Sequence, residues 1–180
     1  MFHSPTIVPA EGDAPWSETV RSGDIVAFRF PAQEGEAGPE PKARPCLVIA
    51  TATIAGQRWL TVAYGTTALG KARKGYAIRV RTREAVAAGL DRATTFRGER
   101  VVIVRANHRA FAINPALRTP VIGRLAGSPL ERMRWVQARL QAEADMAAER
   151  RAERRRARFE DRMSIARARA RAAARNVITG

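Results

Sequence analysis

The sequence predicts a mainly β fold of the α+β kind, in which a small, strongly curved antiparallel sheet or barrel precedes a long C-terminal α-helix. Three observations support this prediction. Short runs of β-branched and aromatic residues recur along the first two thirds of the chain, separated by turn residues. Most of the ten prolines and thirteen glycines lie before residue 130. From Ser128 onward the apolar residues take helical spacing, and Ala, Arg and Glu dominate.

The first two predicted strands flank a long loop. A turn at residues 22–24 leads into a strand at 25–30, in which apolar side chains alternate between two faces. Residues 31–43 contain three prolines and two glycines, so we expect a loop there, and its length favours a functional role. Residues 44–51 are apolar nearly throughout, which is typical of a central strand.

The remaining strands are shorter and more polar. After a turn at 55–57 we expect strands at 58–65, 76–81, 99–105 and 119–125, with a further short strand at 110–113 inside a loop. Pro120 places the last strand at a sheet edge or strand start. Residues 82–90 read as one or two helical turns, with Thr82 as N-cap and Gly89 as the stop, followed by a polar connection at 91–97.

The C-terminal helix has a clear start signal. Ser128 is placed to cap it, Pro129 suits its first turn, and Glu131 completes a capping box. Its first part carries an apolar stripe that should dock on the sheet, and we expect the helix to continue, solvated, to about Arg175. This stripe is made of Leu130, Met133, Val136 and Leu140. We therefore divide the chain into a flexible leader (1–20, its end pinned by Trp16), a barrel domain (21–140) and an Arg/Ala-rich helical extension (141–180).

Charge is distributed unevenly along the chain. Residues 1–41 carry seven acids and two arginines, a net charge of −5. Residues 42–140 carry nineteen basic and four acidic residues, net +15, and residues 141–180 carry eleven arginines and six acids, net +5. A basic body of this kind is typical of a protein that meets a polyanion such as nucleic acid or an acidic partner. High arginine usage across a whole proteome would explain part of the charge equally well.

Other features of the sequence limit where the protein is expected in the cell and which kinds of reaction it could catalyse. We find neither a secretion signal nor an apolar run of membrane-spanning length, so we expect a cytoplasmic protein without membrane contact. Cys46 is the single cysteine and His3 and His108 are the only histidines, which argues against a disulfide framework, a zinc site or a two-histidine catalytic pair. No nucleotide-binding glycine loop or serine-hydrolase elbow is present, and we predict no metal and no cofactor.

Arg44 and Thr66 are the side chains best placed for chemistry. Arg44 stands where the long loop enters the central strand, and Pro45 stiffens the backbone directly after it. A guanidinium there presents paired donors that suit a phosphate or a phosphorane-like transition state. Thr66 follows the neighbouring strand, so both groups would lie on one rim of the barrel. A surface arginine and a turn threonine would give the same spacing.

Three motifs together resemble the MazF/PemK family of growth-inhibiting toxins. They are Gly23-Asp24-Ile25-Val26, then Lys42-Ala43-Arg44-Pro45 before an apolar strand, then Ala63-Tyr64-Gly65-Thr66-Thr67. Residues 121–125 followed by a helix are similar to that family's closing strand and helix, so the likeness covers about residues 22–140. The family's Gly-Ser-Glu-Gln loop motif is absent, and the loop reads Gln33-Glu34-Gly35-Glu36 instead.

The resemblance implies an SH3-like barrel that dimerises and a metal-independent endoribonuclease that cleaves single-stranded RNA by attack of the substrate's own 2′-hydroxyl. It implies Arg44 and Thr66 as catalytic residues and an acidic-tailed antitoxin as partner. Because the loop motif differs, the resemblance does not fix a loop acid, and Glu36 and Glu40 are the candidates in this sequence. We assign substrate binding to the polar and basic residues around them. The Arg-rich extension either contacts RNA, DNA or the acidic antitoxin, or is simply a solvated helix. These substrate-binding residues are Lys42, Thr67, Lys71, Arg73, Lys74 and Arg79. The altered loop leaves open an alternative, a non-catalytic barrel that binds nucleic acid or a partner.

Overall fold

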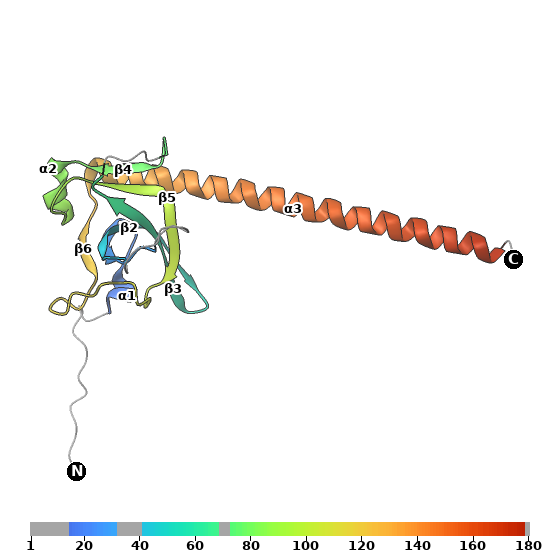
Figure 1. Cartoon of the computed structure of the whole chain (residues 1–180), viewed down its shortest axis with the longest axis horizontal. Helices are drawn as coiled ribbons and strands as arrows, with labels where there is room; N and C mark the ends of the chain where they lie inside the picture. The colour runs from blue at the N-terminus through green and yellow to red at the C-terminus, as the bar shows by residue number, and fades with distance from the viewer. Residues whose placement is uncertain (1–14, 32–40, 69–72, 179–180) are drawn as a thin grey trace, which may run out of the picture. The chain divides into compact units, whose positions relative to one another are not determined.

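A computed structural model of the chain describes residues 15–31, 41–68 and 73–178, the last nine of these as backbone only. Its centre is a six-stranded antiparallel sheet in the order β4-β5-β3-β2-β1-β6, curled into a half-barrel and followed by a long helix (Figure 1). The predicted α+β fold class is therefore confirmed. The strands are β1 (Asp24–Phe28), β2 (Arg44–Ile54), β3 (Gln57–Thr66), β4 (Ala77–Val80), β5 (Thr94–Arg105) and β6 (Val121–Arg124). The helices are α1 (Trp16–Thr19), α2 (Thr82–Ala85), the 3-10 turn η1 (Val86–Ala88) and α3 (Gly127–Ile178).

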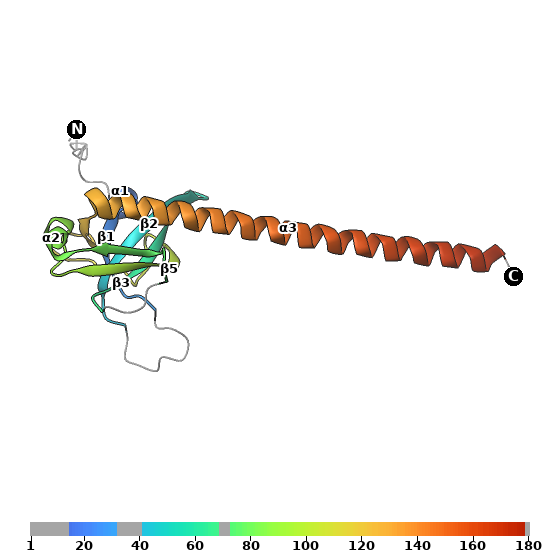
Figure 2. The same ribbon diagram turned by 90° about the horizontal axis from the view of Figure 1, so that it is seen from above.

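Both faces of the sheet carry a core, because alternate residues of each strand point to opposite sides. The inside of the curl is filled by one buried cluster, against which Trp16 of α1 packs as predicted. Buried residues that point to the opposite face of the sheet form a second core. The first turns of α3 cover this face and contribute Met133 and Val136 to that core (Figure 2). The inner cluster includes Val26, Phe28, Phe30, Cys46, Val48, Leu60, Val62 and Phe111, and the outer set includes Ile25, Leu47, Ile49, Ile78 and Phe96.

The Gly-Asp pair at the start of β1 has a structural reason. Gly23 adopts a φ of 94°, which favours glycine, and its carbonyl accepts from Leu125 just after β6. Asp24 is buried, accepts a hydrogen bond from the Arg21 N–H at 2.8 Å and forms an ion pair with Arg124 at 3.0 Å. This pair of residues therefore fixes the turn into β1 and ties β1 to the edge strand β6.

The largest difference from the sequence prediction concerns β5. The strand begins at Thr94, within the segment that we expected to be a polar connection, and not at Glu99. Its first residues pair with both β3 and β4, and the register shifts between Ala63 and Tyr64, where the partner residue jumps from Val101 to Arg97. This irregularity interrupts the apolar alternation from which a strand is predicted. The predicted strand at 110–113 is reduced to an isolated bridge between Phe28 and Phe111.

Helix ends also differ from the prediction. Arg81, not Thr82, is the N-cap of α2, whereas Gly89 ends the following turn at φ 74° as expected. α3 begins at Gly127, and the Ser128 hydroxyl donates to Glu84 at 3.2 Å instead of capping its own helix. The last strand does lie at a sheet edge.

The chain divides into two compact units, residues 1–137 and 138–180, and α3 contributes to both. Within the segment predicted as a leader, Trp16–Thr19 form α1 and Val20 is buried. In the second unit, apolar side chains of α3 such as Met146 and Phe159 are exposed. No helix in the described part of the chain has the length and apolar character needed to cross a membrane.

Gly65→Ala should destabilise the protein by roughly 3 kcal/mol, because a Cβ at this position would collide with the backbone carbonyl oxygen of Pro45 on β2. Gly56→Ala is the matched control: Gly56 has a φ of 72°, but a Cβ there meets open space, so only backbone strain of about 1 kcal/mol applies. Urea denaturation of both variants measures the difference. Equal losses would contradict the close packing of β2 on β3.

Candidate functional site

The structure brings Arg44 and Thr66 together. Leu47 pairs with Ala63 and Val48 with Val62, and continuing this register places Arg44 opposite Thr66. Both residues line a cavity of about 700 Å³ at the rim of the half-barrel, which we call the Arg44–Thr66 cleft. Its lining is Lys42, Ala43, Arg44, Pro45, Gly65, Thr66, Thr67, Arg92 and Thr94.

Arg44 is held by its backbone and by a neighbouring side chain. It is the first residue of β2, where it pairs with Phe28, and Pro45 pairs with Ala27. The Nη1 group of Arg44 donates to the Tyr64 hydroxyl at 3.3 Å. The side chain of Arg44 is otherwise exposed, so the rest of its guanidinium is available to a ligand in the cleft.

Tyr64 and Arg100 extend the site beyond the residues predicted from the sequence. The Arg100 guanidinium lies 4.1 Å from the Tyr64 ring centroid and 5.3 Å from that of Phe30, and it donates to the Pro31 carbonyl at 3.4 Å. Tyr64 thus lies between two arginines, one at its hydroxyl and one over its ring. Tyr64 could have been found from its place two residues before Thr66 on the same face of β3. Arg100 could not be placed from the sequence, because it lies where the pairing of β5 with β3 is irregular.

The Thr66 hydroxyl group is free to donate a hydrogen bond into the cleft. Its Oγ1 accepts a hydrogen bond from the Ala68 N–H at 3.1 Å. With that acceptor position used by the backbone, the hydroxyl hydrogen points elsewhere and is available to an anionic oxygen. The cleft lining adds the cationic side chains of Lys42 and Arg92 and contains no carboxylate among the described residues. The cleft is therefore lined by positive charge and hydroxyl groups.

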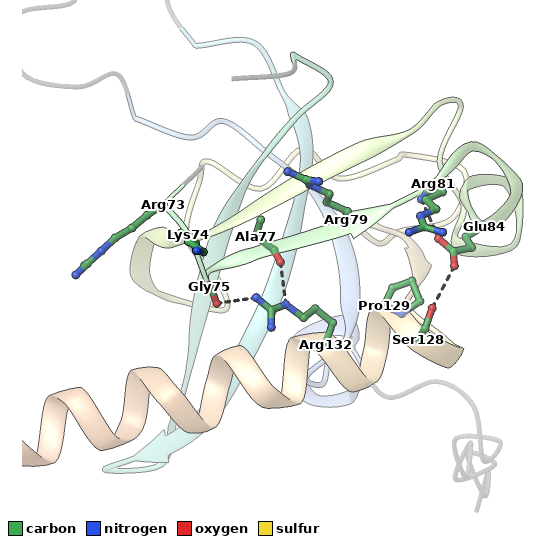
Figure 3. Close-up of a pocket in the computed structure, with 10 residues that line it drawn as sticks. All are labelled: Arg73, Lys74, Gly75, Ala77, Arg79, Arg81, Glu84, Ser128, Pro129 and Arg132. Atoms are coloured by element: carbon green, nitrogen blue, oxygen red, sulfur yellow. Dashed lines mark hydrogen bonds between the residues drawn. The ribbon is translucent and has the colours of Figure 1, made fainter. Parts of the chain in front are cut away.

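The other predicted site residues fall into two groups. Lys42 and Thr67 line the cleft with Arg44 and Thr66. Arg73, Lys74 and Arg79 line a separate cavity of about 530 Å³ next to β4 (Figure 3). Lys71 and the proposed loop acids Glu36 and Glu40 lie outside the described residues.

Cys46 follows Pro45 of the cleft lining, but its thiol is unreactive at neutral pH. Burial raises the pKa of its thiol to about 11, although a hydrogen bond with the Gly65 backbone and the charges of Arg44 and Arg100 act in the opposite direction. At neutral pH the thiol is protonated and packed in the inner core. It therefore contributes packing and not a nucleophile.

Residues with metal-binding side chains do not gather in the described ranges, where no three His, Cys, Asp or Glu residues are grouped to hold an ion. His108 lies in a turn, exposed, and its Nδ1 accepts a hydrogen bond from the Ala110 N–H at 3.1 Å. This contact gives His108 a local structural role in the turn.

Comparison with known proteins adds no relative. The chain matches no protein-family model and no curated protein.

Alkylation of Cys46 should be about 100-fold slower at pH 8 in the native protein than in denaturant. A pKa of about 11 leaves about one thiol in a thousand ionised at that pH, against about one in ten for the ordinary value of 9.0. Burial slows access of the reagent further. Mass spectrometry of the protein after timed iodoacetamide treatment measures both rates. Rapid, stoichiometric labelling of the folded protein would contradict a buried, protonated thiol.

Proposed function

We propose that the chain is the toxin of a toxin–antitoxin system, a metal-independent, sequence-preferring endoribonuclease that cleaves single-stranded mRNA. The observation that supports this proposal best is the meeting of Arg44 and Thr66 in one cationic cleft, although they come from different strands. The motif resemblance to the MazF/PemK family, which includes these two residues, also supports it. A basic body with net +15 over residues 42–140 provides the field that attracts RNA.

In the proposed reaction the substrate's 2′-oxygen attacks the adjacent phosphorus and loses its proton. The bond from phosphorus to the 5′-oxygen breaks, and that oxygen leaves with a proton as a 5′-hydroxyl, so the other fragment ends in a 2′,3′-cyclic phosphate. Arg44 donates paired hydrogen bonds to the non-bridging oxygens, whose charge grows in the phosphorane-like transition state. Thr66 donates its hydroxyl to one of the same oxygens. We assign the proton transfers to a loop acid, Glu36 or Glu40.

Lys42 and Thr67 bind the RNA phosphates that flank the scissile bond within the cleft. Tyr64 is a positioning residue in this scheme, because it holds Nη1 of Arg44 and leaves the other guanidinium nitrogens for the substrate. We also propose a cytoplasmic homodimer, neutralised by an acidic-tailed antitoxin. DNA contact through residues 141–180 is proposed from their net charge of +5.

One observation favours a second function. The described lining of the cleft has no carboxylate or histidine to serve as general base. A barrel that binds RNA or a protein partner without turnover would need only the cationic cleft. Such a protein would show affinity for RNA that falls steeply with salt and would release no fragments.

Arg44→Ala should abolish RNA cleavage, with a loss of about 10²–10³-fold in rate, because it removes the main donor to the transition-state charge. Arg44→Lys should recover little of this activity, because an ammonium keeps the charge but not the paired donors. Gels of cellular RNA after induction, with growth curves, compare both variants with wild type.

Arg109→Ala is the matched control for these variants, since Arg109 is also an exposed arginine but lies outside the cleft. It should arrest growth as wild type does. Thermal unfolding of all three variants should match wild type, because each change is at the surface. If wild type and Arg44→Ala leave growth and RNA equally intact, the nuclease proposal fails.

A further inference from the structure

A second cationic cavity lies between the edge strand β4 and the start of α3, and we call it the β4–α3 groove (Figure 3). Arg132 of α3 donates from Nη2 to the Gly75 carbonyl at 2.8 Å and from Nε to the Ala77 carbonyl at 3.1 Å. These bonds use carbonyl groups that the free edge of β4 would otherwise present to another strand. Arg132 therefore fixes the helix against the edge and forms the floor of a groove of about 530 Å³.

The groove carries far more positive than negative charge. Arg73, Lys74, Arg79, Arg81 and Arg132 line it, against the single carboxylate of Glu84. That carboxylate already accepts the Arg81 N–H at 2.9 Å and the Ser128 hydroxyl at 3.2 Å. Its pKa lies below the ordinary value, chiefly because of the bond from the Arg81 backbone, so it stays ionised and engaged.

Three of these cations have no acidic partner among the described residues. Among the described residues, no carboxylate oxygen lies within 4.0 Å of the side-chain cations of Arg73, Lys74 or Arg79, although Glu99 accepts the Arg73 backbone N–H at 3.0 Å. Arg97, by contrast, is on the same face of the sheet as Arg79 but is paired with Glu99 at 2.8 Å. The Arg73 guanidinium is held 4.8 Å from the Tyr76 ring centroid. With five cationic side chains and one carboxylate in its lining, the groove is positively charged.

The sheet register connects this groove with the Arg44–Thr66 cleft. Thr95 of β5 pairs with Thr66 of β3 on one side and with Arg79 of β4 on the other. Paired residues point to the same face, so these three side chains form one row across adjacent strands. At about 4.8 Å per strand, Arg79 lies about 10 Å from Thr66. A linear ligand that fills the cleft can thus continue over hydroxyls into the groove.

We propose that the β4–α3 groove binds the sugar–phosphate backbone of single-stranded RNA beyond the cleaved bond, with the strand crossing Thr95 between the two cationic sites. This inference rests on the proposed function for its RNA substrate. Unpaired cations separated by a hydroxyl-bearing row match a linear chain of phosphates, which arginine and lysine contact without reading the base sequence. Arg81 and Thr95 are thereby added to the substrate-binding residues, and Arg132 positions the groove.

The test measures binding separately from cleavage. A fluorescent, mixed-sequence RNA oligonucleotide with 2′-O-methyl riboses has no 2′-hydroxyl to attack, so only binding is observed. The double variant Lys74→Gln/Arg79→Gln should bind it about tenfold more weakly, and the slope of log affinity against log salt should fall by about 1.4 for two lost phosphate contacts. Fluorescence anisotropy over a salt series gives both quantities.

The charge-matched control is Arg109→Gln/Arg118→Gln, since neither residue lines the groove or the cleft. It should retain the wild-type slope and most of the affinity. Wild-type affinity and slope in the groove variant would overturn the inference. So would unchanged RNA binding together with lost binding of poly-glutamate, because the groove would then serve an acidic protein. If wild-type protein cleaves no cellular RNA but the groove variant still loses affinity, the nuclease proposal fails and the groove stands as a nucleic-acid site.

Discussion

The pairing of β2 with β3 at the centre of the sheet is the constraint on which the rest of the structure depends. Leu47, Val48 and Ile49 are buried on alternate faces, so this one strand fills both cores, and each such side chain contributes about 1.5–3 kcal/mol by leaving water. The absence of a Cβ at Gly65 lets the Pro45 carbonyl approach β3 closely. That approach fixes the register, and the register decides that Arg44 and Thr66 face each other at the rim. A slip of β2 by one residue against β3 would put the two side chains on opposite faces of the sheet.

The sequence predicted the fold class, the central strand and the convergence of Arg44 with Thr66, because each has a local signal: an apolar run, an Arg-Pro pair and a threonine at a strand end. It did not predict the start of β5 at Thr94, because polar residues that pair on both sides leave no apolar alternation. It also missed Arg100, which lies within the irregular segment of β5 between Arg97 and Val101. The role of Ser128 depends on Glu84, a residue 44 positions away, and no local pattern records such a contact.

The site combines a rigid frame with unbalanced charge. Tyr64 accepts a hydrogen bond from Nη1 of Arg44, and its ring lies against the Arg100 guanidinium, so both arginines contact the same side chain. Preorganised donors of this kind favour a state in which negative charge grows, which is the requirement for phosphoryl transfer. Behind them the protonated Cys46 thiol adds packing without reactivity. The wider basic surface adds attraction that is independent of sequence.

The chemical identity of the new fragment ends shows whether Arg44 and Thr66 promote attack by the substrate's own 2′-hydroxyl. Purified protein is incubated with unmodified single-stranded RNA in the presence of EDTA, and the fragments are analysed by mass spectrometry. Wild type should form 2′,3′-cyclic phosphate ends paired with 5′-hydroxyl ends, and Arg44→Ala should not. Fragments with 5′-phosphate ends, or cyclic phosphates formed equally by both proteins, would contradict this mechanism.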